Sequence, residues 1–134
     1  MIAVDTSVVV AAFATWHRGH EAAVGALARR PRLPAHALVE SYSVLTRLPA
    51  PHTAAAPTVG EFLRARFSAA PLILPANLYR RLLDTAQAAG ISGGAIYDAL
   101  IAATAKNVNA VLLTRDRRAV ATYEKIGARI ELIA

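Results

Sequence analysis

The amino-acid sequence predicts an α/β protein, a three-layer α/β/α sandwich around a central and mostly parallel sheet. Short apolar runs that suit buried parallel strands recur along the chain, and segments with helical patterns lie between them. The chain has 134 residues and is 55% hydrophobic, which is enough for one domain, residues 1–134, with a single core. We expect about five strands in the spatial order 3-2-1-4-5, as in doubly wound sheets.

The expected strands are short and continuously apolar, because a parallel strand that is covered on both faces shows no polar alternation. A weaker candidate lies near Leu33. The stronger predicted strands are Ile2–Val4, Leu72–Leu74, Val111–Leu113 and Ile130–Leu132.

The expected helices fill the intervals between these strands. The segment Val8–Ala14 is wholly apolar, and its valines favour a strand by propensity, but we predict a helix inside the core. The proline-rich stretch Pro49–Thr58 is predicted to be a loop. The other predicted helices are His17–Ala28, Ala35–Leu48, Thr58–Phe67, Ala76–Ala89, Ala95–Lys106 and Arg117–Ile126.

Composition excludes several classes of protein. The absence of Cys excludes disulfides, Cys-based zinc sites and a Cys nucleophile. No apolar run approaches the ~18 residues of a membrane helix, and no basic segment precedes the first apolar run, so we expect a soluble cytoplasmic protein. The net charge of +6 favours a polyanionic partner such as nucleic acid, although basic residues also serve solubility alone.

Two acidic residues follow predicted strands. Asp5 directly follows Ile2–Val4, and Asp116 comes soon after Val111–Leu113 in "VLLTRD". Ligand sites of open α/β sheets lie at the carboxyl ends of the strands, where the strand order reverses. In the assumed order the first and fourth strands are neighbours, which would bring both acids together. Asp5 has an alternative interpretation as a helix N-cap, because Asp-Thr-Ser precedes a helical segment.

Two further acids belong to predicted helices. Glu40 lies in the largely apolar segment "PAHALVESYSVLTRL" and needs a partner there, which would be an Arg, solvent or a metal. Asp98 lies near the start of a predicted helix, where it could simply complement the helix dipole.

Taken together, these segments resemble a PIN-domain ribonuclease, and in particular the VapC-type toxins of toxin–antitoxin pairs. The resemblance covers nearly the whole chain and makes the expected fold PIN-like. The matching pieces are "VDTSVVVA", "HRGHEAA", "LPAHALVESYSVLTRLP", "IYDALIAATAKNVNAVLLTRD" and a terminal strand.

The resemblance implies which residues form the site. Asp5, Glu40, Asp98 and Asp116 match the four acids that bind Mg²⁺ or Mn²⁺ in such nucleases, and Ser7 and Thr114 match hydroxyl positions that support the first and last acids. The physics agrees, because two carboxylates ~5 Å apart repel by about 3 kcal/mol at an effective dielectric constant of ~20. Divalent cations with oxygen ligands would relieve this repulsion.

The expected function is that of a Mg²⁺-dependent endoribonuclease in which metal-activated water attacks an RNA phosphodiester. By resemblance, the products carry 5′-phosphate and 3′-hydroxyl ends. The family also implies a VapB-type antitoxin, whose C-terminal segment blocks the site, and a homodimer. Arg115, Arg117 and Arg118 flank Asp116 and could hold RNA phosphates, or could be ordinary solvated residues.

Three alternatives stay open from the sequence. The chain could be a PIN nuclease of RNA processing rather than a toxin, or a non-catalytic RNA-binding PIN module. A phospho-receiver domain also carries acids at strand ends, but it needs paired acids after the first strand, and "VDTS" has one. The presence of all four acids of the resemblance argues against the non-catalytic module.

Overall fold

A computed structural model describes residues 1–134 of the protein. Its sheet has three parallel strands, β1 (Ile2–Val4), β2 (Val111–Thr114) and β3 (Arg129–Leu132), in the order β1-β2-β3. Ala3 pairs with Leu112, which in turn pairs with Ile130. Strands from the two ends of the sequence therefore form the centre of the molecule.

Two further segments extend this sheet beyond β1 through single parallel bridges. Arg32 bridges to Ala3, and Leu72 bridges to Pro34. The spatial order of the five segments is thus the predicted 3-2-1-4-5, but the two on this side form bridges in place of regular strands. Pro34 has no N–H to donate, which limits how far pairing can continue at this edge.

Seven α-helices connect and cover the strands, one for each predicted helix. Most bounds agree to within two or three residues. The bounds are α1 (Thr6–Phe13), α2 (His20–Ala28), α3 (Ala35–Thr46), α4 (Ala56–Arg66), α5 (Tyr79–Ala88), α6 (Ala95–Asn107) and α7 (Val120–Ile126), with a short 3₁₀ turn, η1 (Ala76–Leu78), before α5.

Three helices begin three residues later than the sequence predicts, and in α5 the missing turn is the 3₁₀ turn η1. The segment before α2 forms turns, and the helix begins only after Gly19. Before α7, the backbone N–H of Arg118 donates to the Asp116 carboxylate, and the N–H of Ala119 donates to the Asp116 carbonyl. These bonds close a turn over residues 116–119, and the helix begins only after it.

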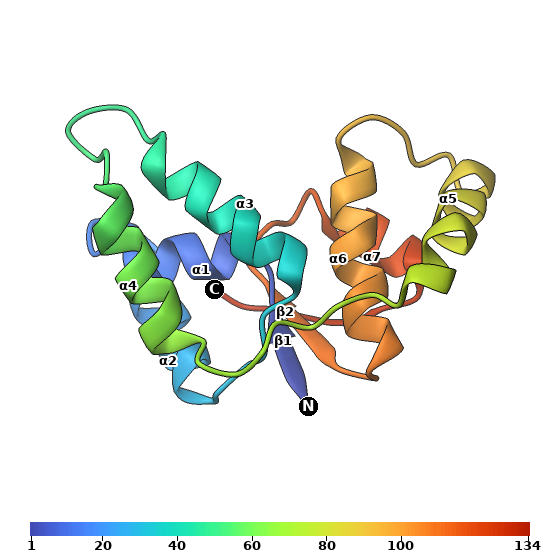
Figure 1. Cartoon of the computed structure of the whole chain (residues 1–134), viewed down its shortest axis with the longest axis horizontal. Helices are drawn as coiled ribbons and strands as arrows, with labels where there is room; N and C mark the ends of the chain where they lie inside the picture. The colour runs from blue at the N-terminus through green and yellow to red at the C-terminus, as the bar shows by residue number, and fades with distance from the viewer.

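The helices form layers around the strands. Figure 1 shows α1 and α2 on one side of the strands and α5 to α7 on the other. Helix α3 packs against α1, α4 and α6, so it connects the two groups. None of the helices is both long and apolar enough to cross a membrane.

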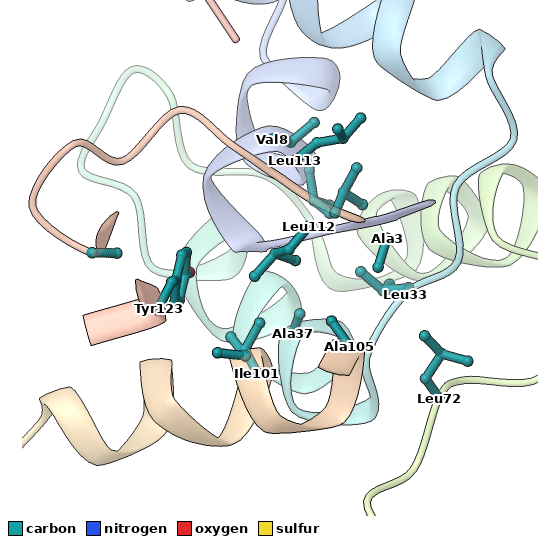
Figure 2. Packing of buried hydrophobic residues seen from close by; sticks show 14 of the residues in the cluster. Ala3, Val8, Leu33, Ala37, Leu72, Ile101, Ala105, Leu112, Leu113 and Tyr123 are labelled. Atoms are coloured by element: carbon teal, nitrogen blue, oxygen red, sulfur yellow. The ribbon is translucent and has the colours of Figure 1, made fainter. Parts of the chain in front are cut away.

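The core is built on β2, which has a neighbour on each edge. Leu113 points toward Val8 of α1, and Leu112 points to the opposite face, toward Ile101 of α6, as Figure 2 shows. Ala37 and Ala105 are fully buried where α3 approaches α6, and their small side chains permit close contact between these helices. The Asp5 N-cap starts α1, and the packing of Val8 in this core holds the segment as a helix against its strand propensity.

Candidate functional site

The four acids predicted from the sequence lie around the carboxyl ends of β1 and β2. Asp5 directly follows β1, and its backbone N–H donates to the carbonyl of Leu113 on β2. Asp116 lies two residues beyond the end of β2. Glu40 lies within α3, and Asp98 lies in the first turn of α6. The sheet order therefore makes neighbours of Asp5 and Asp116, as expected.

Asp5 is almost completely buried, with 2% of its surface exposed, and accepts hydrogen bonds on both carboxylate oxygens. Oδ1 accepts from the hydroxyl of Ser7 at 2.5 Å and from the backbone N–H of Val8 at 3.3 Å. Oδ2 accepts from the hydroxyls of Thr114 and Tyr123. Asp5 is also the N-cap of α1, which confirms the capping interpretation of this residue, while its role as a metal ligand stays a prediction.

The hydroxyls of Ser7 and Thr114 connect Asp5 to the loop that carries Asp116. Ser7 Oγ accepts the backbone N–H of Arg115 at 2.9 Å, and Thr114 Oγ1 accepts the backbone N–H of Asp116 at 3.0 Å. Each hydroxyl has one proton, and here it is donated to Asp5. The two predicted supporting residues therefore hold the first acid and the loop of the fourth acid in one network.

Glu40 is held beside the start of α1. It accepts a hydrogen bond from the hydroxyl of Thr6, which is the residue next to Asp5. On its own helix, Nε2 of His36 lies 3.9 Å from Glu40 Oε2, and the His36 ring stacks on Tyr97 with ring centroids 5.1 Å apart. Thr6 thus supplies the partner that a Glu on this helix needs.

Asp98 experiences the charges of all three other acids. Its pKa is raised to about 6, first by burial and then by the negative charges of Glu40, Asp116 and Asp5. Burial also raises the pKa of Asp5, although the hydrogen bonds from Ser7, Thr114, Tyr123 and Val8 act in the opposite direction. Segments far apart in the sequence are therefore folded into one acidic site.

A divalent cation fits this site by the chemistry of its donors. All four acids offer hard oxygen ligands, and none of the ion pairs of the chain involves Asp98 or Asp5. No three of the His, Asp and Glu side chains converge closely enough to enclose an ion by themselves. An ion here would therefore keep water among its ligands, as Mg²⁺ commonly does.

Tyr123 belongs to the site but was missed in the sequence. It lies on α7 with 1% of its surface exposed, and its hydroxyl donates to Asp5 Oδ2 at 2.8 Å. Burial and the charge of Asp5 raise its pKa, so the phenol keeps its proton. A buried Tyr signals that its hydroxyl needs a partner, but the local sequence does not reveal which residue supplies it.

The three arginines near Asp116 differ in their surroundings. Arg115 donates from Nε to the carbonyl of Ala134 at 2.8 Å, and a Cβ on Gly19 would come within 2.2 Å of its guanidinium carbon. Arg118 is 96% exposed, with Nε 3.8 Å from Asp116 Oδ1, and Arg117 is also exposed. Arg117 and Arg118 are thus available to a ligand, whereas Arg115 already anchors the C-terminus.

Comparison with known proteins agrees with this site. Residues 2–125 match the family described as PIN domain. The chain is 56% identical over 133 residues to Ribonuclease VapC40 of Mycobacterium tuberculosis, covering 99% of both chains. It is 44% identical to Ribonuclease VapC27 of the same species, covering 99% of this chain and 97% of the relative.

Among solved structures, the fold is similar to that in a crystal structure of FitAcB from Neisseria gonorrhoeae, with a TM-score of 0.71 and 22% identity. The similarity covers 97% of this chain and 96% of that chain. These findings confirm the PIN-like α/β fold and the resemblance seen in the sequence. The chain belongs to the PIN-domain family, within its VapC ribonuclease group.

Proposed function

We propose that this PIN domain is a Mg²⁺- or Mn²⁺-dependent endoribonuclease and the toxin of a VapBC-type pair. The observation that supports this most is the pKa of Asp98, raised to about 6 by burial and by the charges of three further acids. The proposal is that these carboxylates, around the carboxyl ends of two parallel strands, bind a hydrated cation and a phosphodiester. Two relatives that match nearly the whole chain are named ribonucleases.

The acids would have different roles. Asp5 and Asp98 are the proposed direct ligands, and Glu40 and Asp116 are proposed as direct or water-mediated ligands, one of which orients the attacking water. When bound, the ion supplies a more acidic water and polarises the phosphate. Ser7 and Thr114 hold Asp5 in place, and Thr6 keeps Glu40 beside it.

The substrate would be bound mainly through its phosphates. The chain has a net charge of +6 although four of its nine acidic residues gather at the site. Arg117 and Arg118 are exposed next to Asp116, where their guanidinium groups can reach an RNA backbone. We expect them to contribute to affinity, because both side chains are exposed and a guanidinium group suits phosphate contacts.

The family assignment supports a proposal for the partners. We propose a cognate VapB-type antitoxin that covers the acidic site, a homodimer as the basic unit, and action in the cytoplasm. The antitoxin is the partner that separates a toxin from a housekeeping PIN nuclease of RNA processing.

Incubation of the purified chain with total RNA, with MgCl₂ or with EDTA, tests the activity when the cleaved ends are mapped. We expect discrete cleavage with Mg²⁺ that is lost in Asp98→Asn. Asp84→Asn, which removes an exposed acid on α5, is the matched control and should cleave like the wild type. RNA binding without cleavage under any metal condition would favour the non-catalytic module.

A further inference from the structure

The hydroxyl of Tyr123 donates a hydrogen bond to Asp5, the first of the four acids. Its ring stands on α7 within the packed core, as Figure 2 shows, and its oxygen lies 2.8 Å from Asp5 Oδ2. Helix α7 packs mainly on α6 and β3. The contact joins residues 118 positions apart in the sequence.

The other hydroxyls around Asp5 have a second task. Ser7 and Thr114 each accept a backbone N–H of the loop after β2, so their removal would also disturb that loop. The Tyr123 hydroxyl forms its hydrogen bond to Asp5 alone. A variant that lacks this hydroxyl therefore changes the surroundings of Asp5 without removing another contact.

The two oxygens of Asp5 are held unequally. Oδ2 receives two hydroxyl donors, from Thr114 and Tyr123. Oδ1 receives one hydroxyl, from Ser7, and the longer contact from the Val8 N–H at 3.3 Å. A carboxylate has about four lone-pair positions, and all are occupied here, so a ligand gains access most easily where the contact is weakest. That position is on Oδ1.

We propose that Tyr123 is a positioning residue that holds Oδ2 of Asp5 and so directs Oδ1 toward the metal ion. The proposal rests on the metal-dependent function proposed above. Without the phenol, a buried carboxylate oxygen keeps a single donor, and Asp5 can turn to satisfy it. Loss of such supporting partners commonly lowers metal affinity by about 10-fold or more.

The test is a calorimetric titration of MgCl₂ into the metal-free full chain, for the wild type and for Tyr123→Phe. We expect an affinity for Mg²⁺ about 10-fold lower in Tyr123→Phe. At limiting Mg²⁺ the variant should show a lower kcat for RNA with an unchanged KM. Thr104→Val is the matched control. Thr104 also carries a buried hydroxyl, but this hydroxyl donates to the Leu100 carbonyl and forms no hydrogen bond with Asp5.

A merely structural Tyr123 would give a different result. Tyr123→Phe and Thr104→Val would then lower the melting temperature alike and leave the Mg²⁺ affinity equal to that of the wild type, which overturns the proposal. A second measurement uses the wild type alone, with ¹³C-labelled tyrosine followed by NMR during the MgCl₂ titration. The Tyr123 ring signal should shift with the same apparent Kd as the calorimetry, and an unmoved signal also overturns the proposal.

The same experiments separate this proposal from the proposed function. A wild type that binds no Mg²⁺ at millimolar concentrations overturns the metal-dependent function and the role of Tyr123 together. A wild type that binds Mg²⁺, with Tyr123→Phe binding equally well, overturns only the role of Tyr123.

Discussion

Glu40 on α3 and Asp98 on α6 lie close enough for their charges to interact. Burial raises the pKa of Asp98, and the charge of Glu40 is the next cause, which together with Asp116 and Asp5 brings this pKa to about 6. The two residues are brought together by the packing of α3 against α6, where Ala37 and Ala105 allow a close approach. The acidic site is therefore a source of strain in the metal-free protein.

This strain predicts a pH dependence of stability. In the unfolded chain Asp98 titrates near its ordinary pKa of 3.8, whereas in the fold it titrates near 6. The folded state therefore holds more protons between these values, so stability falls as the pH rises from about 4 to about 6. After allowance for screening at this half-buried site, the loss is on the order of 1–2 kcal/mol.

Chemical denaturation of the metal-free protein at pH 5 and pH 7 measures this effect. Asp98→Asn should be more stable than the wild type at pH 7. The change in its free energy of unfolding between pH 5 and pH 7 should be smaller than that of the wild type. Asp84→Asn should show the same change in the free energy of unfolding between the two pH values as the wild type. An Asp98→Asn variant with the full pH dependence of the wild type would contradict the assignment.

Divalent cations should reverse the effect. Under the proposed function, Mg²⁺ binds the folded site and not the dispersed acids of the unfolded chain, so we expect it to raise the melting temperature. At a Mg²⁺ concentration ten times its Kd, the ion should add about 1.4 kcal/mol to the free energy of unfolding. Thermal melts in MgCl₂ against EDTA check this, and the shift should disappear in the double variant Glu40→Gln, Asp98→Asn. Identical curves for the wild type would argue against a cation site.

Asp5 requires a conservative substitution. Asp5→Ala removes the N-cap of α1 and leaves the hydroxyls of Ser7, Thr114 and Tyr123 without their acceptor. We expect Asp5→Ala to be less stable than Asp5→Asn by about 2 kcal/mol, because unsatisfied buried donors are costly. Both variants should lose RNA cleavage. Cleavage by Asp5→Asn at the wild-type rate in saturating Mg²⁺ would remove Asp5 from the proposed ligands.

The arginines after β2 should act on RNA affinity. On an Asp98→Asn background, where RNA stays uncut, Arg117→Ala with Arg118→Ala should weaken binding and flatten the log–log salt slope by roughly 0.7 for each lost phosphate contact. The matched control is Arg80→Ala with Arg81→Ala, which removes two exposed arginines from α5. Equal slopes in both pairs would mean that Arg117 and Arg118 are ordinary surface charge.

Much of the site can be predicted from the sequence. Asp5 and Asp116 follow apolar strands directly or within a few residues, and parallel strands end at a common edge, so their convergence follows from the strand order alone. The hydroxyls of Ser7 and Thr114 were identified by their place in the family pattern. These positions are local, because each is defined by the few residues around it.

The bridges at the edge of the sheet and the contacts of Arg115 could not be predicted from the sequence. Apolar runs near Leu33 and Leu72 predict strands, but Pro34 and the neighbouring loops reduce them to bridges. Arg115 resembles its two neighbours in the sequence, yet it alone reaches the carbonyl of Ala134 and lies against Gly19. Both differences depend on which segments the fold places nearby.

The sequence by itself therefore determined the fold class, the identity of the four acids and the resemblance of the chain to PIN nucleases. These depend on periodicity, on strand ends and on residue type, all of which are encoded in short stretches of chain. Only the tertiary structure decided that Tyr123 holds Asp5, that Thr6 holds Glu40 and that Asp98 takes up the repulsion of the other acids. The physical reason is that hydrogen bonding and charge interaction act over a few ångströms, and packing alone sets which distant residues come within that range.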